Sequence, residues 1–257
     1  MPKFLRPLFC RVGSKVSVRN EILQVLSKVK HDVYVEPFVG GGTIFWSKTP
    51  AKKNIINDLD KTLMNAYRLI KKVSSNPNDF PSWNSLDKAK RFFGKKNKNI
   101  NEKLSHEILA TCGGFGSQYA TKVSQLYKGA NPARKTKNIV KYKERMKNTT
   151  IKTWDYKRII KKYDSKNTLF FLDPPYEASK GLYKDYGMDY PMMAKLLKKI
   201  KGKFLLTIND SQNIREVFKT FFLVQINVRA QGNVGIGKNN RGELFVTNFK
   251  YDPDSID

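Results

Sequence analysis

Short apolar strands alternate with amphipathic helices toward both ends of this chain of 257 residues, and that alternation limits its fold more than any other feature. Residues 32–36 alternate like a strand, residues 54–57 form a second short strand, and a helix that Asp60 can cap follows. After residue 151 the alternation returns, with a fully apolar strand at Thr168–Leu172. This order predicts an α/β protein with a parallel sheet covered by helices.

The later part of the chain adds further elements of the same kinds. We expect helices at residues 18–30, 155–163, 190–200 and 211–220, and strands at residues 204–208, 222–228 and 244–249. A loop rich in Gly, Asn and Lys separates the last two strands, which indicates an antiparallel hairpin.

The middle of the chain, residues 73–150, has a different pattern. Two helical stretches, residues 84–93 and 101–112, precede a glycine-rich turn at residues 113–116. Residues 128–147 carry eight Lys or Arg and one acid, a net charge of +7. A charge run is usually a solvated face, but here it lies in a segment with little strand pattern. We therefore predict an inserted, mainly helical module.

The positive charge of the chain favours nucleic acid as its partner. Lys and Arg number 49 and Asp and Glu 22, which gives a net charge of +27. An acidic ligand, a membrane surface and the codon bias of an AT-rich genome stay open as alternatives. No apolar run approaches the roughly 18 residues of a membrane span, and we expect neither a membrane segment nor a secretory signal.

Cysteine and histidine are scarce, which limits the available chemistry. Cys10, Cys112, His31 and His106 are the complete set, and their spacing matches no metal site. We therefore expect no metal, no hydrolase triad and two reduced cysteines in an intracellular protein. The compartment would be the bacterial cytoplasm, or a host cell if a phage or virus encodes the chain.

A glycine-rich loop follows the first strand directly. It reads Glu36-Pro37-Phe38-Val39-Gly40-Gly41-Gly42-Thr43, and small residues there let the backbone approach a nucleotide-like ligand. Asp58 ends the next strand, eighteen residues after Gly40, where a carboxylate suits ribose hydroxyls. Taken alone, each feature also fits a plain tight turn or a helix cap. The spacing is not G-x-G-x-x-G, which disfavours a nicotinamide dinucleotide.

A second motif, Asp173-Pro174-Pro175-Tyr176, ends the apolar strand. The prolines fix the backbone and remove two donors, leaving carbonyl acceptors. Asp173 and the Pro174 carbonyl can each accept one hydrogen of an exocyclic amine, and Tyr176 can stack on the ring that carries it. The motif therefore indicates a site for a planar amine.

Together these motifs resemble the S-adenosylmethionine-dependent amino-methyltransferases of DNA, and among them the Dam-like adenine methyltransferases. Arg11-Val12-Gly13-Ser14-Lys15 is similar to their amino-terminal motif, although Arg11 stands where the family often has Trp and Ser14 replaces a glycine. Glu36–Gly42 matches their Glu-Pro-Phe-x-Gly-x-Gly motif, and Asp58 resembles their ribose-binding acid. The resemblance implies a Rossmann-like methyltransferase fold, with a mostly parallel seven-stranded sheet and a C-terminal antiparallel hairpin.

The resemblance also assigns domains and site residues. Residues 1–72 and 151–257 would form the catalytic domain, and residues 73–150 an inserted target-recognition domain. The cofactor, S-adenosyl-L-methionine, would contact Arg11, Gly13, Lys15, Glu36, Pro37, Phe38, Gly40, Gly42, Asp58 and Asp173. The catalytic residues would be Asp173, Pro174, Pro175 and Tyr176, and the DNA-binding residues Arg134, Lys135, Lys137 and Lys141.

The implied reaction methylates the N6 amine of adenine in double-stranded DNA. Asp173 and the Pro174 carbonyl would orient the amine, Tyr176 would stack on the flipped base, and residues 181–186 would close over it. Thr111–Ser117 stands where GATC-specific enzymes carry their base-reading Asn-Arg hairpin, so GATC specificity does not carry over. A cytosine-N4 methyltransferase, an RNA adenine methyltransferase and an inactive DNA-binding subunit of a methyltransferase pair stay open as alternatives. A homodimer stays open as the assembly.

Overall fold

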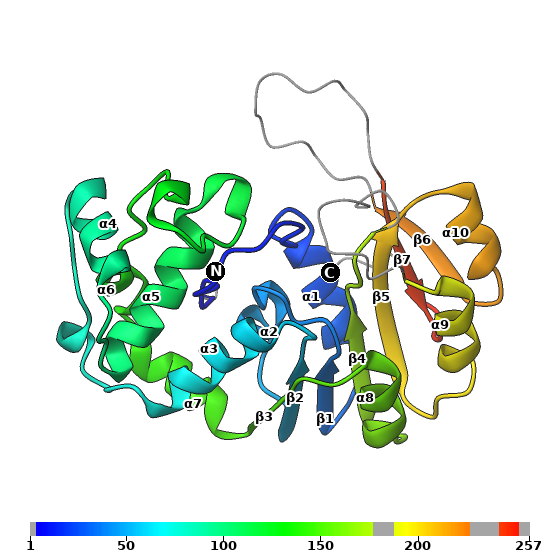
Figure 1. Ribbon diagram of the computed structural model, residues 1–257. Helices are drawn as coiled ribbons and strands as arrows, with labels where there is room; N and C mark the ends of the chain where they lie inside the picture. The colour runs from blue at the N-terminus through cyan, green and yellow to red at the C-terminus, as the bar shows by residue number, and fades with distance from the viewer. Residues whose placement is uncertain (1–3, 177–187, 227–241, 252–257) are drawn as a thin grey trace. The chain divides into compact units, whose positions relative to one another are not determined.

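The computed structural model describes residues 4–176, 188–226 and 242–251 (Figure 1). The chain divides into two compact units. The first consists of Met1–Lys15, Gly40–Thr49 and Asp58–Thr153, and the second of Val16–Val39, Pro50–Asn57 and Trp154–Asp257. Residues 73–150 all fall within the first unit. The narrower boundaries expected for the recognition domain stay a prediction.

The sheet has seven strands among the described residues, in the order β3-β2-β1-β4-β5-β7-β6. They are β1 (Val33–Glu36), β2 (Lys53–Asn57), β3 (Thr149–Lys152), β4 (Thr168–Leu172), β5 (Lys203–Asn209), β6 (Phe222–Ile226) and β7 (Glu243–Thr247). Strands β2, β1, β4 and β5 are parallel, and β7 runs antiparallel between β5 and β6. This confirms the predicted Rossmann-like α/β fold and its C-terminal hairpin.

The second unit has its core on this sheet. Every residue of β4 is buried, as expected for a continuous apolar strand at the centre of a parallel sheet. The helices of this unit are α1 (Arg19–Ser27), α8 (Tyr156–Tyr163), α9 (Tyr190–Leu197) and α10 (Gln212–Val217). Ile160 of α8, Met193 of α9 and Ile214 of α10 pack with the sheet residues Phe170 and Leu206.

Because β1, β2 and β4 are parallel, their carboxyl ends lie at one edge of the sheet. Pro37 follows β1, Asn57 ends β2 and Asp173 follows β4, so all three come to that edge. The topology therefore places Pro37 and the start of the Asp-Pro-Pro-Tyr motif at the edge where α/β proteins bind ligands.

The first unit is mainly helical. It contains α2 (Thr43–Ser47), α3 (Lys61–Lys72), α4 (Leu86–Gly94), α5 (Ile100–Gly113), α6 (Pro132–Thr136) and α7 (Ile139–Lys147), with short 3₁₀ turns between them. The Asp60 carboxylate caps α3 by accepting from the Leu63 backbone N–H at 3.0 Å, as predicted. A separate apolar cluster that includes Trp83, Phe93 and Leu109 gives α4 and α5 a core of their own.

The sequence did not predict α2 and β3, because neither segment shows a periodic hydrophobic pattern. Helix α2 has only five residues, and Thr43–Trp46 are all buried, so no amphipathic stripe marks it. Strand β3 has four residues, two of them threonines. The closing loop expected at residues 181–186 and the loop between β6 and β7 lie outside the described residues.

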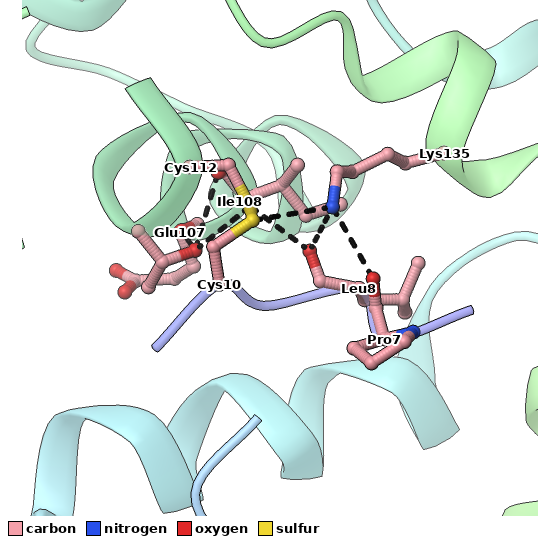
Figure 2. The surroundings of a disulfide bond; sticks show 8 residues. Pro7, Leu8, Cys10, Glu107, Ile108, Cys112 and Lys135 are labelled. Atoms are coloured by element: carbon pink, nitrogen blue, oxygen red, sulfur yellow. Dashed lines mark hydrogen bonds between the residues drawn. A yellow bond between two sulfur atoms is a disulfide. The ribbon is translucent and has the colours of Figure 1, made fainter. Parts of the chain in front are cut away.

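The expectation of two reduced cysteines is wrong. Cys10 and Cys112 form a disulfide, with their Cα atoms 4.9 Å apart (Figure 2). It ties the amino-terminal segment to the end of α5 within the first unit. The two residues are 102 positions apart in the chain, and no local pattern reports such a distant pairing.

Within the described ranges, no helix combines the length and hydropathy needed to cross a membrane. The same ranges contain no cluster of three metal-ligating side chains.

Candidate active site

The glycine loop and Asp58 are joined directly in the first unit. The backbone N–H of Gly40 donates to Asp58 Oδ2 at 3.1 Å, and that of Asp60 donates to Asp58 Oδ1 at 3.0 Å. Gly40 and Gly42 both have positive φ, 48° and 75°. A Cβ on Gly42 would also lie 2.5 Å from the Tyr67 hydroxyl, so this position excludes any side chain.

The Asp58 carboxylate is half-buried, and burial raises its pKa. The backbone donors of Asp60 and Gly40 and the nearby Arg11 guanidinium lower the pKa, but less than burial raises it. Each carboxylate oxygen accepts one backbone N–H, which leaves each oxygen a second lone pair. Asp58 can therefore accept further hydrogen bonds from a ligand hydroxyl.

The amino-terminal motif lies against the same loop. Arg11 forms an ion pair with Asp60, and its Nε is a buried donor without a partner among the described residues. The hydroxyls of Ser14 and Thr43 hydrogen bond at 2.7 Å. Ser14 departs from the family motif, yet it links that motif to the start of α2. Lys15 is buried, and its Nζ donates to the Gly13 carbonyl at 3.2 Å.

In the second unit, Asn57 connects two loops at the carboxyl edge of the sheet. Its Nδ2 donates to the carbonyls of Pro37 at 2.9 Å and Trp154 at 2.8 Å, and its Oδ1 accepts from the Trp154 N–H at 2.7 Å. The ring of Phe38 packs on that of Tyr156, with centroids 5.4 Å apart. Sequence analysis did not single out Asn57 or Tyr156, because their contacts involve the unrecognised β3–α8 connection.

Glu36 is buried at the end of β1. It accepts a hydrogen bond from the Tyr34 hydroxyl at 2.5 Å, on the same face of the strand. Sequence alternation placed both residues on that face.

The Asp-Pro-Pro-Tyr motif is held by hydroxyl groups from its own unit. Thr207 Oγ1 donates to Asp173 Oδ1 at 3.2 Å, and the Tyr176 hydroxyl donates to Glu243. The hydroxyl of Tyr190 donates to the Pro175 carbonyl at 2.5 Å, and not to the Pro174 carbonyl assigned to the amine. Burial, and then the charges of Asp173 and Glu243, raise the pKa of Tyr176, so its phenol stays protonated.

The four basic residues predicted to bind DNA do not share one environment. Three of them are exposed: Arg134 in α6, Lys137 directly after α6, and Lys141 in α7. Lys135 instead donates from Nζ to the carbonyls of Pro7 and Leu8, each at 3.2 Å (Figure 2). Its Nζ also lies 3.6 Å from Cys10 Sγ, and burial lowers the Lys135 pKa to about 8. Lys135 is thus a structural cation, a poor candidate for a phosphate contact.

An exposed aromatic pair lies in the same basic unit. Phe115 and Tyr127 are 69% and 66% exposed, and their ring centroids are 5.2 Å apart. A β-bridge between Gly114 and Leu126 holds their two loops together, and Gly116 follows with a φ of 58°. The glycines around Phe115 are the sequence signal for this pair, but by themselves they indicate only a turn.

The predicted cofactor residues therefore divide between the units. Arg11, Gly13, Lys15, Gly40, Gly42 and Asp58 belong to the first, and Glu36, Pro37, Phe38 and Asp173 to the second. Within the first unit, Gly40 is bonded to Asp58 and Lys15 to Gly13. The union of all ten residues in one site stays a prediction.

The comparisons with known proteins decide the family. The model of the D12 class N6 adenine-specific DNA methyltransferases matches residues 12–231. The chain belongs to this family. It is thus a DNA adenine-N6 methyltransferase, as the motifs indicated. The family's substrate, adenine in DNA, disfavours the cytosine-N4 and RNA alternatives.

Two Type II methyltransferases are distant relatives that match over nearly their whole length. The Type II methyltransferase M1.LlaDCHI of Lactococcus lactis subsp. cremoris is 24% identical, over 95% of this chain and 96% of its own. The Type II methyltransferase M.MjaIII of Methanocaldococcus jannaschii is 26% identical, over 95% and 99%. An rRNA methylase structure from Streptococcus thermophilus aligns with a TM-score of 0.41 and 8% identity, over 93% of this chain and 98% of that one.

Proposed function

We propose that this enzyme transfers the methyl group of S-adenosylmethionine to the N6 amine of an adenine flipped out of double-stranded DNA. The observation that carries the proposal is the hydroxyl-held Asp-Pro-Pro-Tyr motif at the carboxyl edge of the sheet, where Asp173 and Tyr176 are both fixed. Family membership supplies the reaction, and this motif supplies groups that orient the amine.

The residues of the first unit fit S-adenosylmethionine. Asp58 retains acceptor capacity on both carboxylate oxygens, which suits the two ribose hydroxyls. Arg11 Nε is a buried donor that lacks a partner in the described chain, which suits the carboxylate of the methionine end. When bound, the cofactor supplies an electrophilic methyl group on a sulfonium.

The chain's own groups orient the nucleophile. The adenine amine is weak because its lone pair is delocalised into the ring. Asp173 and the Pro174 carbonyl would each accept one amino hydrogen, which favours a pyramidal nitrogen with its lone pair aimed at the methyl group. Since Tyr176 keeps its proton, it acts by stacking and by donating to Glu243, not as a base. The proton released on transfer would pass to the Asp173 carboxylate or to water.

The first unit would supply the DNA contacts. Arg134, Lys137 and Lys141 are exposed and form no ion pair with a described residue, which suits phosphate contacts. Phe115 and Tyr127 are large exposed aromatic rings on the same basic unit, and such rings can stack on bases or enter a base step. A DNA substrate places the enzyme inside the cell that holds that DNA.

The decisive experiment incubates the purified enzyme with DNA and S-adenosylmethionine and measures methylated nucleosides by mass spectrometry. We expect N6-methyladenine, none with Asp173→Ala, and parent-like yield with Asp87→Ala, an exposed carboxylate on α4. Product that is mainly N4-methylcytosine would overturn the substrate. An enzyme that binds S-adenosylmethionine by calorimetry but yields no product on any duplex would support the inactive-subunit alternative.

A further inference from the structure

Two side chains on neighbouring strands contact the Asp-Pro-Pro-Tyr motif, and neither belongs to a motif that the sequence shows. Thr207 in β5 is completely buried, and its Oγ1 lies 3.2 Å from Asp173 Oδ1 and 3.4 Å from the Leu172 carbonyl. Glu243 opens β7 and accepts the hydroxyl of Tyr176.

The strand register puts these two side chains on one face of the sheet. Strands β5 and β7 pair Thr207 with Phe245 and Asn209 with Glu243. Paired residues share a face in an antiparallel ladder, and so do residues two apart on one strand. Thr207 and Glu243 are therefore diagonal neighbours, and both project from regular strands and not from loops.

We propose that Thr207 and Glu243 are positioning residues for methyl transfer, with Thr207 acting through the carboxylate of Asp173 and Glu243 through the ring of Tyr176. This inference rests on the proposed function of the Asp-Pro-Pro-Tyr motif. It assigns to β5 and β7 the task of fixing the two groups that hold the target adenine.

The terminal torsion of an aspartate is soft, so a carboxylate without a partner rotates easily. By holding Oδ1 of Asp173, the Thr207 hydroxyl fixes the direction of the other oxygen, which would accept the amino hydrogen. Support of this kind is needed, because an error of about 1 Å in the position of a reacting group can slow a reaction by about 100-fold.

Glu243 has the corresponding effect on the aromatic ring. A hydrogen bond at the far end of the phenol fixes the ring plane that the flipped base would stack on. The phenol remains a donor at ordinary pH, since its pKa is raised.

The role of Thr207 is tested by a substitution that removes the hydroxyl and keeps the shape of the side chain. Thr207→Val should lower kcat by about 10- to 100-fold, while the KM for DNA and the Kd for S-adenosylmethionine stay near those of the parent. Thr207→Ser should restore most of kcat. The matched control is Thr168→Val, a buried threonine on β4 whose hydroxyl bonds to the Tyr163 carbonyl instead. Full kcat in Thr207→Val, or no recovery in Thr207→Ser, would overturn this assignment.

Glu243 is tested with a double-mutant cycle. Glu243→Leu and Tyr176→Phe each remove one partner of the same hydrogen bond, so we expect similar losses of kcat and no further loss in the double variant. Glu243→Gln keeps an acceptor oxygen and should retain most of the activity. Losses that multiply in the double variant would show that Glu243 does not act through Tyr176.

Comparing the parent with Asp173→Ala distinguishes a failure of the proposed function from a failure of the positioning inference. If Asp173→Ala methylates DNA at the parent rate, the proposed function of the motif fails. If Asp173→Ala is inactive while Thr207→Val and Glu243→Leu match the parent, the motif assignment stands and only the positioning inference fails. Thermal unfolding of each variant shows whether a loss comes from the fold.

Discussion

The backbone N–H of Gly40 donates to the Asp58 carboxylate at 3.1 Å, although 18 residues separate them in the sequence. The bond joins the glycine loop to the carboxylate proposed to bind ribose.

Replacing Asp58 by alanine should weaken S-adenosylmethionine binding by about 1–3 kcal/mol, because the ligand hydroxyls lose charged acceptors. Isothermal calorimetry on the purified variant measures this, with Asp87→Ala as the control for a lost surface carboxylate. Equal affinity in Asp58→Ala and the parent would refute the ribose assignment.

Neutralising the three exposed cations, Arg134, Lys137 and Lys141, to glutamine should weaken binding to all DNA sequences alike. If each contacts one phosphate, the slope of log affinity against log salt should fall by up to about 2.7 units. Fluorescence anisotropy across a salt series gives the slope. Lys135→Gln should leave the slope unchanged, since its ammonium is bound to backbone carbonyls; a lower slope there would contradict the structure.

Lys135 should make stability depend on pH in a defined direction. Its pKa falls from the ordinary 10.5 to about 8 on folding, so between those values the unfolded chain holds more protons than the folded one. The stability of the parent relative to Lys135→Gln should therefore rise from pH 8 to about pH 10.5 and stay flat below pH 7. Urea unfolding of both proteins across this range tests it, and a constant difference would contradict the buried ammonium.

Phe115→Ala should reduce base extrusion while leaving cofactor affinity intact. Losing one stacking contact costs about 1–3 kcal/mol. A duplex with 2-aminopurine at a mapped target adenine reports extrusion by its fluorescence. Val140→Ala removes an exposed apolar side chain from α7 and serves as the control; an equal loss of signal in both variants would argue against a specific role for the ring.

Reducing the disulfide should destabilise the enzyme. The bridge closes a loop of 102 residues, and a bridge of that span typically stabilises a fold by about 2–5 kcal/mol. Urea unfolding with and without dithiothreitol, and of the Cys10→Ser, Cys112→Ser double variant, measures the difference. Equal midpoints, with thiol titration showing the bond open, would rule out a stabilising bridge.

Local patterns were sufficient for much of the fold. The apolar run of β4, the alternation of β1 and the Asp60 cap of α3 each depend on neighbours in sequence, so the period and the cap residue report them. The glycine loop after β1 was also visible in the sequence, and the positive φ of Gly40 and Gly42 is a structural finding that the sequence analysis did not predict.

The supporting contacts of the site were not predictable in this way. Thr207 and Glu243 reach the Asp-Pro-Pro-Tyr motif from strands 34 and 67 residues further along the chain, through a register that no local pattern encodes. The same holds for Cys10 with Cys112 and for Lys135 with the Leu8 carbonyl. In each case tertiary packing determines the partner. For this reason Lys135 is bound to backbone carbonyls, although the sequence predicted a surface charge that contacts DNA.

The division of the chain has a practical consequence for engineering. The polypeptide passes between the two units five times, and three of these passages fall within or beside the motifs, at Lys15 to Val16, Val39 to Gly40, and Asn57 to Asp58. Neither unit can therefore be expressed as one continuous fragment. Exchanging residues 73–150 with a relative would transplant only part of the first unit, because Met1–Lys15 and Gly40–Thr49 belong to that unit as well.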